Sequence, residues 1–181
     1  MFINNSLVAP LKWGATSFKS APMSIQQLMT HHFQNGKVEW IGIRTKRRQP
    51  MTSVSEVIAL PGKGLAGDHY LAKDGKRQVT IVQKEHLDAV GSFLGIGTPD
   101  PSRVRRNIVI SGINLSSLKG LDFKIGEALL RYTGECHPCS RMEENLGVGG
   151  YNAMRGHGGI TAVVVKEGLT KIGDPLVPIV T

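Results

Sequence analysis

The side chains with the most evident chemistry are two thiols three positions apart, Cys136 and Cys139, in the run Gly134-Glu-Cys-His-Pro-Cys-Ser-Arg-Met. Pro138 favours the start of a helix over residues 140–146, which would place Cys139 at the helix N-terminus, close to Arg141. Backbone amides at a helix start and a nearby guanidinium both stabilise a thiolate, which is a nucleophile and a soft metal ligand. We therefore expect Cys139, rather than Cys136, to be the functional cysteine.

Three other interpretations of the two thiols stay open. A structural zinc site normally takes four ligands, and Cys136, His137 and Cys139 leave the second pair of ligands unaccounted for. A thioredoxin-like redox pair needs a βαβ setting, which this sequence lacks. Two buried, inert thiols are also compatible, since free cysteine is among the most buried residue types. Two cysteines in 181 residues do not make a secreted disulfide framework, so we expect a reducing, cytoplasmic location.

Two glycine-rich segments carry further polar side chains. In the loop of residues 62–70, Gly67 permits a ligand to approach the backbone closely, and Asp68 and His69 follow it. A second loop, residues 151–159, presents Arg155 and His157 before an apolar strand. The alternative for each segment is an ordinary surface turn, because glycine-rich turns are common.

A cluster of arginines is the candidate anion site. Arg103, Arg105 and Arg106 precede Asn107 at the entrance to an apolar strand. The guanidinium presents a planar fork of donors that matches phosphate and carboxylate, although a solvated charged edge would have the same sequence. The chain has 22 Lys and Arg against 14 Asp and Glu, a formal charge of +8, which favours phosphate-bearing partners. It lacks a long basic helix and aromatics spaced for base stacking, so a small phosphorylated ligand fits equally well as nucleic acid.

The elements that must position these residues are mostly strands. Short apolar runs bounded by Gly, Pro and Asp predict strands at 38–45, 54–60, 78–83, 106–110, 127–133, 160–166 and 176–180. One clear helix is predicted at 84–93, and Ser24 can cap a short one over 25–33. This pattern favours a mainly β fold, a barrel or sandwich with a few short helices, over a parallel α/β sheet.

The same pass along the chain predicts its domain organisation. We expect a flexible N-terminal arm over residues 1–22 and a single domain over residues 23–181. No apolar run approaches the ~18 residues that a membrane-spanning helix requires, so we expect no membrane partner.

Six short motifs, in this order, resemble the MOSC domain family, which is named for the C-terminal domain of molybdenum-cofactor sulfurases. They are Gly64-Leu-Ala-Gly67-Asp68-His69, Arg77-Gln-Val-Thr80, Arg105-Arg106-Asn107-Ile108, Cys136-His-Pro-Cys139, Gly158-Gly159-Ile160 and Gly173-Asp174. The resemblance extends from about Lys37 to the C-terminus and is strongest to standalone bacterial members related to reductases of N-hydroxylated bases. It implies a compact MOSC-like β-barrel that binds molybdenum cofactor.

The resemblance also implies roles for the residues singled out above. Cys139 would bind the molybdenum ion, while Asp68, His69 and His157 would position a small N-hydroxylated substrate. An external protein would donate the electrons. The pterin cofactor would be held by Arg105, Arg106, Asn107, Arg155, Gly67 and Arg141. Replacing Arg105 or Arg106 by Ala is then expected to weaken cofactor retention without unfolding the domain.

Other functions stay open beside this molybdenum-dependent oxidoreductase. The protein could be a sulfur or cofactor carrier with a persulfide on Cys139, and Cys136 could form a regulatory disulfide, relay sulfur or have no role. A nucleic-acid-binding barrel is supported by the net charge alone. The family also occurs fused to pyridoxal-phosphate enzymes, but this chain is too short to contain one, so pyridoxal phosphate would belong to a partner protein.

Overall fold

The computed structural model describes residues 22–70 and 75–180, and the described residues fall into two units that divide between His31 and His32. The first unit contains helix α1 (Ile25–Met29). Its N-cap is Ser24, whose hydroxyl accepts a hydrogen bond from the Gln27 amide, while the Gln27 side chain accepts one from the Ser24 amide. The helix is shorter than the predicted 25–33. Nearly all of the predicted arm, residues 1–21, lies outside the described residues.

The second unit is built on a sheet of eight strands, in the spatial order β11-β7-β8-β9-β5-β6-β1-β2. Their bounds are β1 (Gly36–Ile43), β2 (Thr52–Val54), β5 (Val79–Gln83), β6 (Ile108–Ser111), β7 (Asp122–Ile125), β8 (Ala128–Glu135), β9 (Ile160–Lys166) and β11 (Pro175–Ile179). Strand β1 also pairs with β11, so all of these strands except β2 form a closed ring of seven. The prediction of a mainly β-barrel is confirmed.

The strands of the ring differ in direction, and a second, smaller sheet lies outside the ring. Strands β5 and β6 are parallel, and the other described neighbours in the ring are antiparallel. A separate three-stranded sheet consists of β10 (Gly168–Lys171), β3 (Glu56–Leu60) and β4 (Gly64–Leu65). The predicted strand 54–60 is therefore wrong as one element, because its two ends pair in different sheets. Strands β4, β7 and β10 were not predicted.

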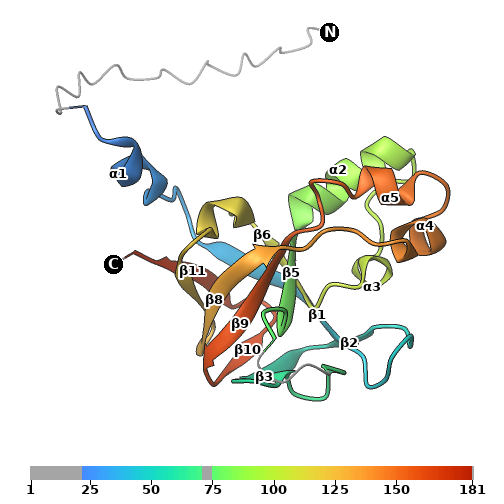
Figure 1. Cartoon of the computed structure of the whole chain (residues 1–181), viewed down its shortest axis with the longest axis horizontal. Helices are drawn as coiled ribbons and strands as arrows, with labels where there is room; N and C mark the ends of the chain where they lie inside the picture. The colour runs from blue at the N-terminus through green and yellow to red at the C-terminus, as the bar shows by residue number, and fades with distance from the viewer. Residues whose placement is uncertain (1–21, 71–74, 181) are drawn as a thin grey trace, which may run out of the picture. The chain divides into compact units, whose positions relative to one another are not determined.

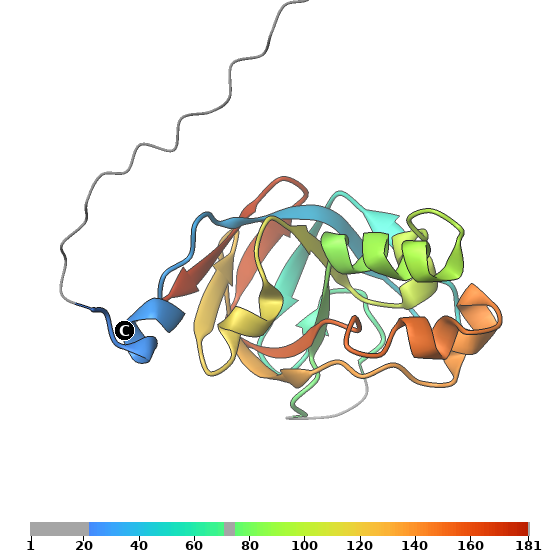
Figure 2. The ribbon, with the colours of Figure 1, turned by 90° about the horizontal axis from the view of Figure 1, so that it is seen from above.

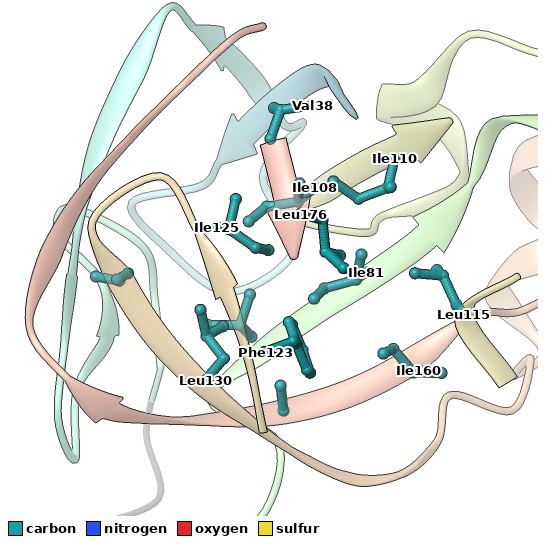
Figure 3. Close-up of a cluster of buried hydrophobic side chains, with 14 of the residues drawn as sticks. Val38, Ile81, Ile108, Ile110, Leu115, Phe123, Ile125, Leu130, Ile160 and Leu176 are labelled. Atoms are coloured by element: carbon teal, nitrogen blue, oxygen red, sulfur yellow. The ribbon is translucent and has the colours of Figure 1, made fainter. Parts of the chain in front are cut away.

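Apolar side chains fill the interior of the barrel (Figure 3). The core includes Val38 of β1, Ile81 of β5, Ile108 of β6, Phe123 of β7 and Leu130 of β8, each at most 1% exposed. Burying an aliphatic or aromatic side chain of this size contributes roughly 1.5–3 kcal/mol. The closed, filled ring gives rigid strand ends, from which the loops described below begin.

Four short helices gather at one end of the barrel: α2 (Lys84–Leu94), α3 (Pro101–Val104), α4 (Arg141–Leu146) and α5 (Gly150–Ala153). The 3-10 turn η1 (Leu115–Leu118) instead packs Leu115 and Leu118 into the barrel core. Figures 1 and 2 show α2, α4 and α5 gathered at the same end. A second apolar cluster, with Val82, Leu87, Val104 and Met142, packs beneath them. None of the described helices is long and apolar enough to cross a membrane.

Candidate functional site

A cavity of about 380 Å³ opens where several loops meet beside β5 and β6. Its walls come from the loop after β1, the loop after β4, the start of β5, the junction of α3 with β6, and the segment between β8 and α4. Seven arginines line it: Arg44, Arg47, Arg48, Arg77, Arg105, Arg106 and Arg141. Among the described lining residues, Asp68 carries the one carboxylate, and Cys136 and Cys139 supply two thiols. The cavity is therefore strongly positive and contains the predicted cysteine.

Asn107 is the buried residue that joins three of these walls. Its Oδ1 accepts hydrogen bonds from the amide and the hydroxyl of Thr80, at 3.1 and 2.8 Å. Its Nδ2 donates to Asp68 Oδ2 at 3.1 Å and to the Gly42 carbonyl at 3.3 Å. The other oxygen of Asp68 accepts from the Arg44 amide at 2.8 Å. Because these bonds use the whole side-chain amide, Asn107 positions the Asp68 loop and has no donor left for a ligand.

Arg106 is likewise used inside the protein, although its guanidinium forms part of the cavity wall. Its Nε, Nη1 and Nη2 donate to the carbonyls of Gly158, Val104 and Cys136, at 2.7, 2.9 and 3.2 Å. Burial lowers the pKa of Arg106, and the two nearby cysteines, Cys136 first, act in the opposite direction. The residue ties three segments of the site together.

Gly158 shows how closely those segments approach. A Cβ at this position would collide with the Cys136 carbonyl oxygen and would lie 3.2 Å from Arg106 Nη2. The Cys136 amide also donates to the Gly159 carbonyl at 2.8 Å. The adjacent glycines therefore permit a backbone contact behind the first cysteine, rather than merely turning the chain.

The two thiols differ in exposure. Cys136 is 2% exposed and accepts a hydrogen bond from Arg77 Nη2 at 3.4 Å, whereas Cys139 is exposed. The predicted helix after Pro138 is confirmed as α4, and the Met142 amide at its start donates to the Cys139 carbonyl at 2.9 Å. Among the described residues, no three His, Cys, Asp or Glu side chains form a metal-binding group. Cys139 is thus the thiol that a ligand in the cavity can reach.

Most of the positive charge in the cavity has no carboxylate partner among the described residues. Burial lowers the pKa of Arg105, and the charges of Arg44 and Arg141 lower it further. Arg141 reaches Glu144 at 3.3 Å, through a partly exposed contact. Buried Arg44 Nε and His69 Nε2 have no hydrogen-bond partner in the described parts of the chain. Buried polar atoms are normally paired, so these two are candidates to contact a ligand.

The structure brings together most of the residues predicted for the site, but not all of them. Asp68, His69, Arg105, Arg106, Asn107, Cys139 and Arg141 all line the cavity. Three others are not among its lining residues. Gly67 precedes the Asp68 turn, Arg155 is exposed, and His157 packs its ring against His86 and Phe93, with centroids 4.8 and 5.4 Å apart.

Four arginines of the cavity were not among the predicted site residues, although Arg77 lies in one of the motifs that carry the family resemblance. Arg44, Arg47 and Arg48 follow β1, and Arg77 precedes β5. The available signal was the dense basic run of residues 44–48, directly after a predicted strand. A solvated charged loop has the same appearance, so spacing alone would not have assigned these residues to a site.

Comparison with known proteins identifies relatives of this fold. A model of the MOSC domain matches residues 29–177. Among solved structures, YuaD from Bacillus subtilis has a TM-score of 0.69 at 22% identity, covering 79% of this chain and 94% of that one. YiiM from Geobacillus stearothermophilus has a TM-score of 0.62 at 18% identity, covering 80% and 75%. YiiM from Escherichia coli has a TM-score of 0.61 at 19% identity, covering 80% and 70%. No curated protein matches the chain in sequence.

Proposed function

The chain belongs to the MOSC domain family, whose domains are associated with molybdenum cofactor, and we propose that its cavity binds this cofactor for the reduction of small N-hydroxylated compounds. One observation carries the proposal: a single exposed thiol, Cys139, lies in a cavity lined by seven arginines. A thiolate suits a molybdenum ion, and guanidinium groups suit the phosphate of the pterin.

The residues present fit such a group. Arg44 Nε and His69 Nε2 are buried without described partners, so Arg44 can form a hydrogen bond to the cofactor phosphate and His69 one to the substrate. Arg105 is crowded by the charges of Arg44 and Arg141, and an anion beside it would offset that repulsion. A cavity of about 380 Å³ falls within the usual range for small-molecule sites.

In this proposal each residue has a role that its contacts support. Cys139 holds the metal, and Arg105, Arg141 and Arg44 hold the phosphate. Arg106 and Asn107 position these groups through their bonds to backbone and to Asp68. When bound, the cofactor would supply the two-electron chemistry by which an N–OH group and two protons become an N–H group and water. His69 Nε2 hydrogen-bonds the substrate hydroxyl, and an external protein supplies the electrons.

The test compares two single-atom changes of equal size. Protein produced in a host that makes the cofactor is assayed for molybdenum, pterin and reduction of N-hydroxylated compounds. We expect Cys139→Ser to abolish metal-dependent activity and Cys136→Ser to retain a substantial part of it, because Cys139 is exposed in the cavity while Cys136 is buried behind Arg77. Equal losses in the two variants would contradict the role of Cys139.

The alternative function, a sulfur or cofactor carrier, uses the same thiol, Cys139. The same protein preparation, from a host that makes the cofactor, distinguishes the carrier from the reductase. Exposure of Cys139 also suits acceptance of a sulfur atom from a donor protein. Persulfide on Cys139, with little turnover and no bound pterin, would favour the carrier over the reductase. Nucleic-acid binding without bound cofactor would favour the third function, for which net charge is the support.

A further inference from the structure

A groove of about 280 Å³ lies beside the cavity and shares part of its wall. Arg48, Met51, Arg105 and Arg141 line both spaces, which are therefore adjacent and share these side chains as a common wall. The groove also has Arg103 in its lining. Among the described residues that line it, four are arginines and none carries a carboxylate. The arginine-rich lining thus continues beyond the cavity that contains Cys139.

Two of the shared arginines have a positive φ, a backbone conformation that residues other than glycine rarely adopt. Arg48 has a φ of 70° and Arg105 a φ of 59°, and within residues 22–70 and 75–180 every other positive φ belongs to glycine. Arg105 is the C-cap of α3, where glycine adopts this conformation without steric cost. Backbone strain of this kind clusters at ligand sites. An arginine in place of the easier glycine indicates a use for its side chain.

Hydrogen bonds hold the walls of the groove in place. Arg103 Nε donates to the Asn145 carbonyl at 2.8 Å, and Asn145 Nδ2 donates to the Arg103 carbonyl at 2.7 Å, so α3 and α4 are fastened together. Arg105 Nη1 donates to the Gln49 carbonyl at 3.3 Å, which holds the loop after β1 against the end of α3. These contacts leave Arg48, which has no described side-chain partner, and most donors of Arg141 available to a ligand.

We propose that this groove is a second anion subsite, which binds a phosphate group on the same ligand whose other end occupies the cavity. The identity of that other end rests on the proposed function. Two ligands have the required chemistry: a pterin cofactor extended by a nucleotide through a diphosphate, and an N-hydroxylated substrate that carries its own phosphate.

The first experiment titrates inorganic phosphate into the cofactor-free full chain by calorimetry. We expect two phosphate sites in the wild type. Arg48→Gln should weaken the second site at least tenfold, since a charge-assisted contact is lost, while Arg77→Gln should weaken only the cavity site. Lys46→Gln is the matched control, because it removes the same charge from the same loop at a residue that lines neither space. One site in the wild type, or equal weakening by Lys46→Gln and Arg48→Gln, would overturn the subsite.

This titration uses no molybdenum, so its failure is distinguishable from failure of the proposed function. Two phosphate sites in a protein that never binds the cofactor would support the groove subsite and refute the reductase function. One phosphate site in a protein that does bind the cofactor would refute the groove subsite and leave the proposed function standing.

A second experiment, on the cofactor-loaded protein, identifies the ligand. Release of a nucleotide from the bound pterin by mild acid hydrolysis assigns the groove to the cofactor. A rise in KM in Arg48→Gln, confined to phosphorylated substrates, assigns it to the substrate. Absence of both results overturns the proposed ligand.

Discussion

Replacing Arg106 with Met should destabilise the barrel strongly, whereas the same change at Arg105 should not. The Arg106 side chain is 6% exposed and donates to three backbone carbonyls. A buried acceptor left without a donor costs about 1–3 kcal/mol. Water from the cavity can replace part of the loss and Met removes a buried charge, so we take the lower end for each, about 3 kcal/mol in total. In a domain of this size, that lowers Tm by roughly 6–12 °C.

Thermal and urea unfolding of the cofactor-free protein measures this effect, because ligand binding then adds nothing to the difference. Arg105→Met is the matched control, since the half-buried Arg105 makes one described bond, to Gln49, at 3.3 Å. The sequence predicts that Arg106 can be replaced without unfolding the domain, and its three bonds to backbone carbonyls lead us to expect a large loss of stability in addition. Midpoints of the two variants within about 2 °C of each other would refute the positioning role.

Three more changes test the site and its supports. Arg105→Lys should recover only part of the pterin retention lost in Arg105→Ala, because an ammonium lacks the planar fork, and full recovery would show that charge alone suffices. Gly158→Ala should lower Tm more than Gly62→Ala, because a Cβ at Gly158 would collide with the Cys136 carbonyl, whereas Ala at Gly62 would meet no atom within 4 Å and only the strain of a φ of 73°; equal shifts would contradict the close approach. Burial, and then His157, lower the pKa of His86 below 6.5, while Glu85 raises it. The folded state therefore binds fewer protons than the unfolded one, and stability present above pH 6.5 is lost as the pH falls through 6.5 toward the lower folded pKa. His86→Phe should show a smaller fall in Tm between about pH 7.5 and 5.5 than the wild type, and parallel curves would contradict this.

Elements whose signals are complete within their own residues were predicted well. The helix expected at 84–93 is α2, which ends at Gly95 in the left-handed conformation with a φ of 66°. The strand expected at 160–166 has the bounds of β9. The run 54–60 failed because its division depends on partners: Thr52–Val54 pairs with β1, while Glu56–Leu60 pairs with β10 and β4. Composition and periodicity hold no information about which strand will pair with which.

Site residues of a type that is rare in this sequence, such as cysteine, were easier to predict than those of a common type, such as arginine. Two cysteines in one short motif drew attention to the segment that lines the cavity. Arg44 and Arg77, by contrast, lie in segments that meet only after β1 and β5 take their places in the ring. Arg105 and Arg106 are adjacent and alike in sequence. Arg105 donates one described hydrogen bond, whereas Arg106 donates three to backbone carbonyls. This difference arises from the backbone at the α3–β6 junction, which the sequence does not reveal.

The arrangement of bonds around the cavity explains how so many arginines can be held together. Like charges repel, so seven guanidinium groups in one cavity lower the free energy of unfolding. Other contacts must therefore stabilise the backbone that carries them. Asn107 provides that support with a neutral side chain, because it joins Thr80 on β5, Gly42 on β1 and the Asp68 loop without adding charge. Donors that are already in place need not be ordered when an anion enters, which favours binding. The residues with the most internal hydrogen bonds therefore position the site, and the less bonded arginines, such as Arg48 and Arg44, are the ones left to contact a ligand.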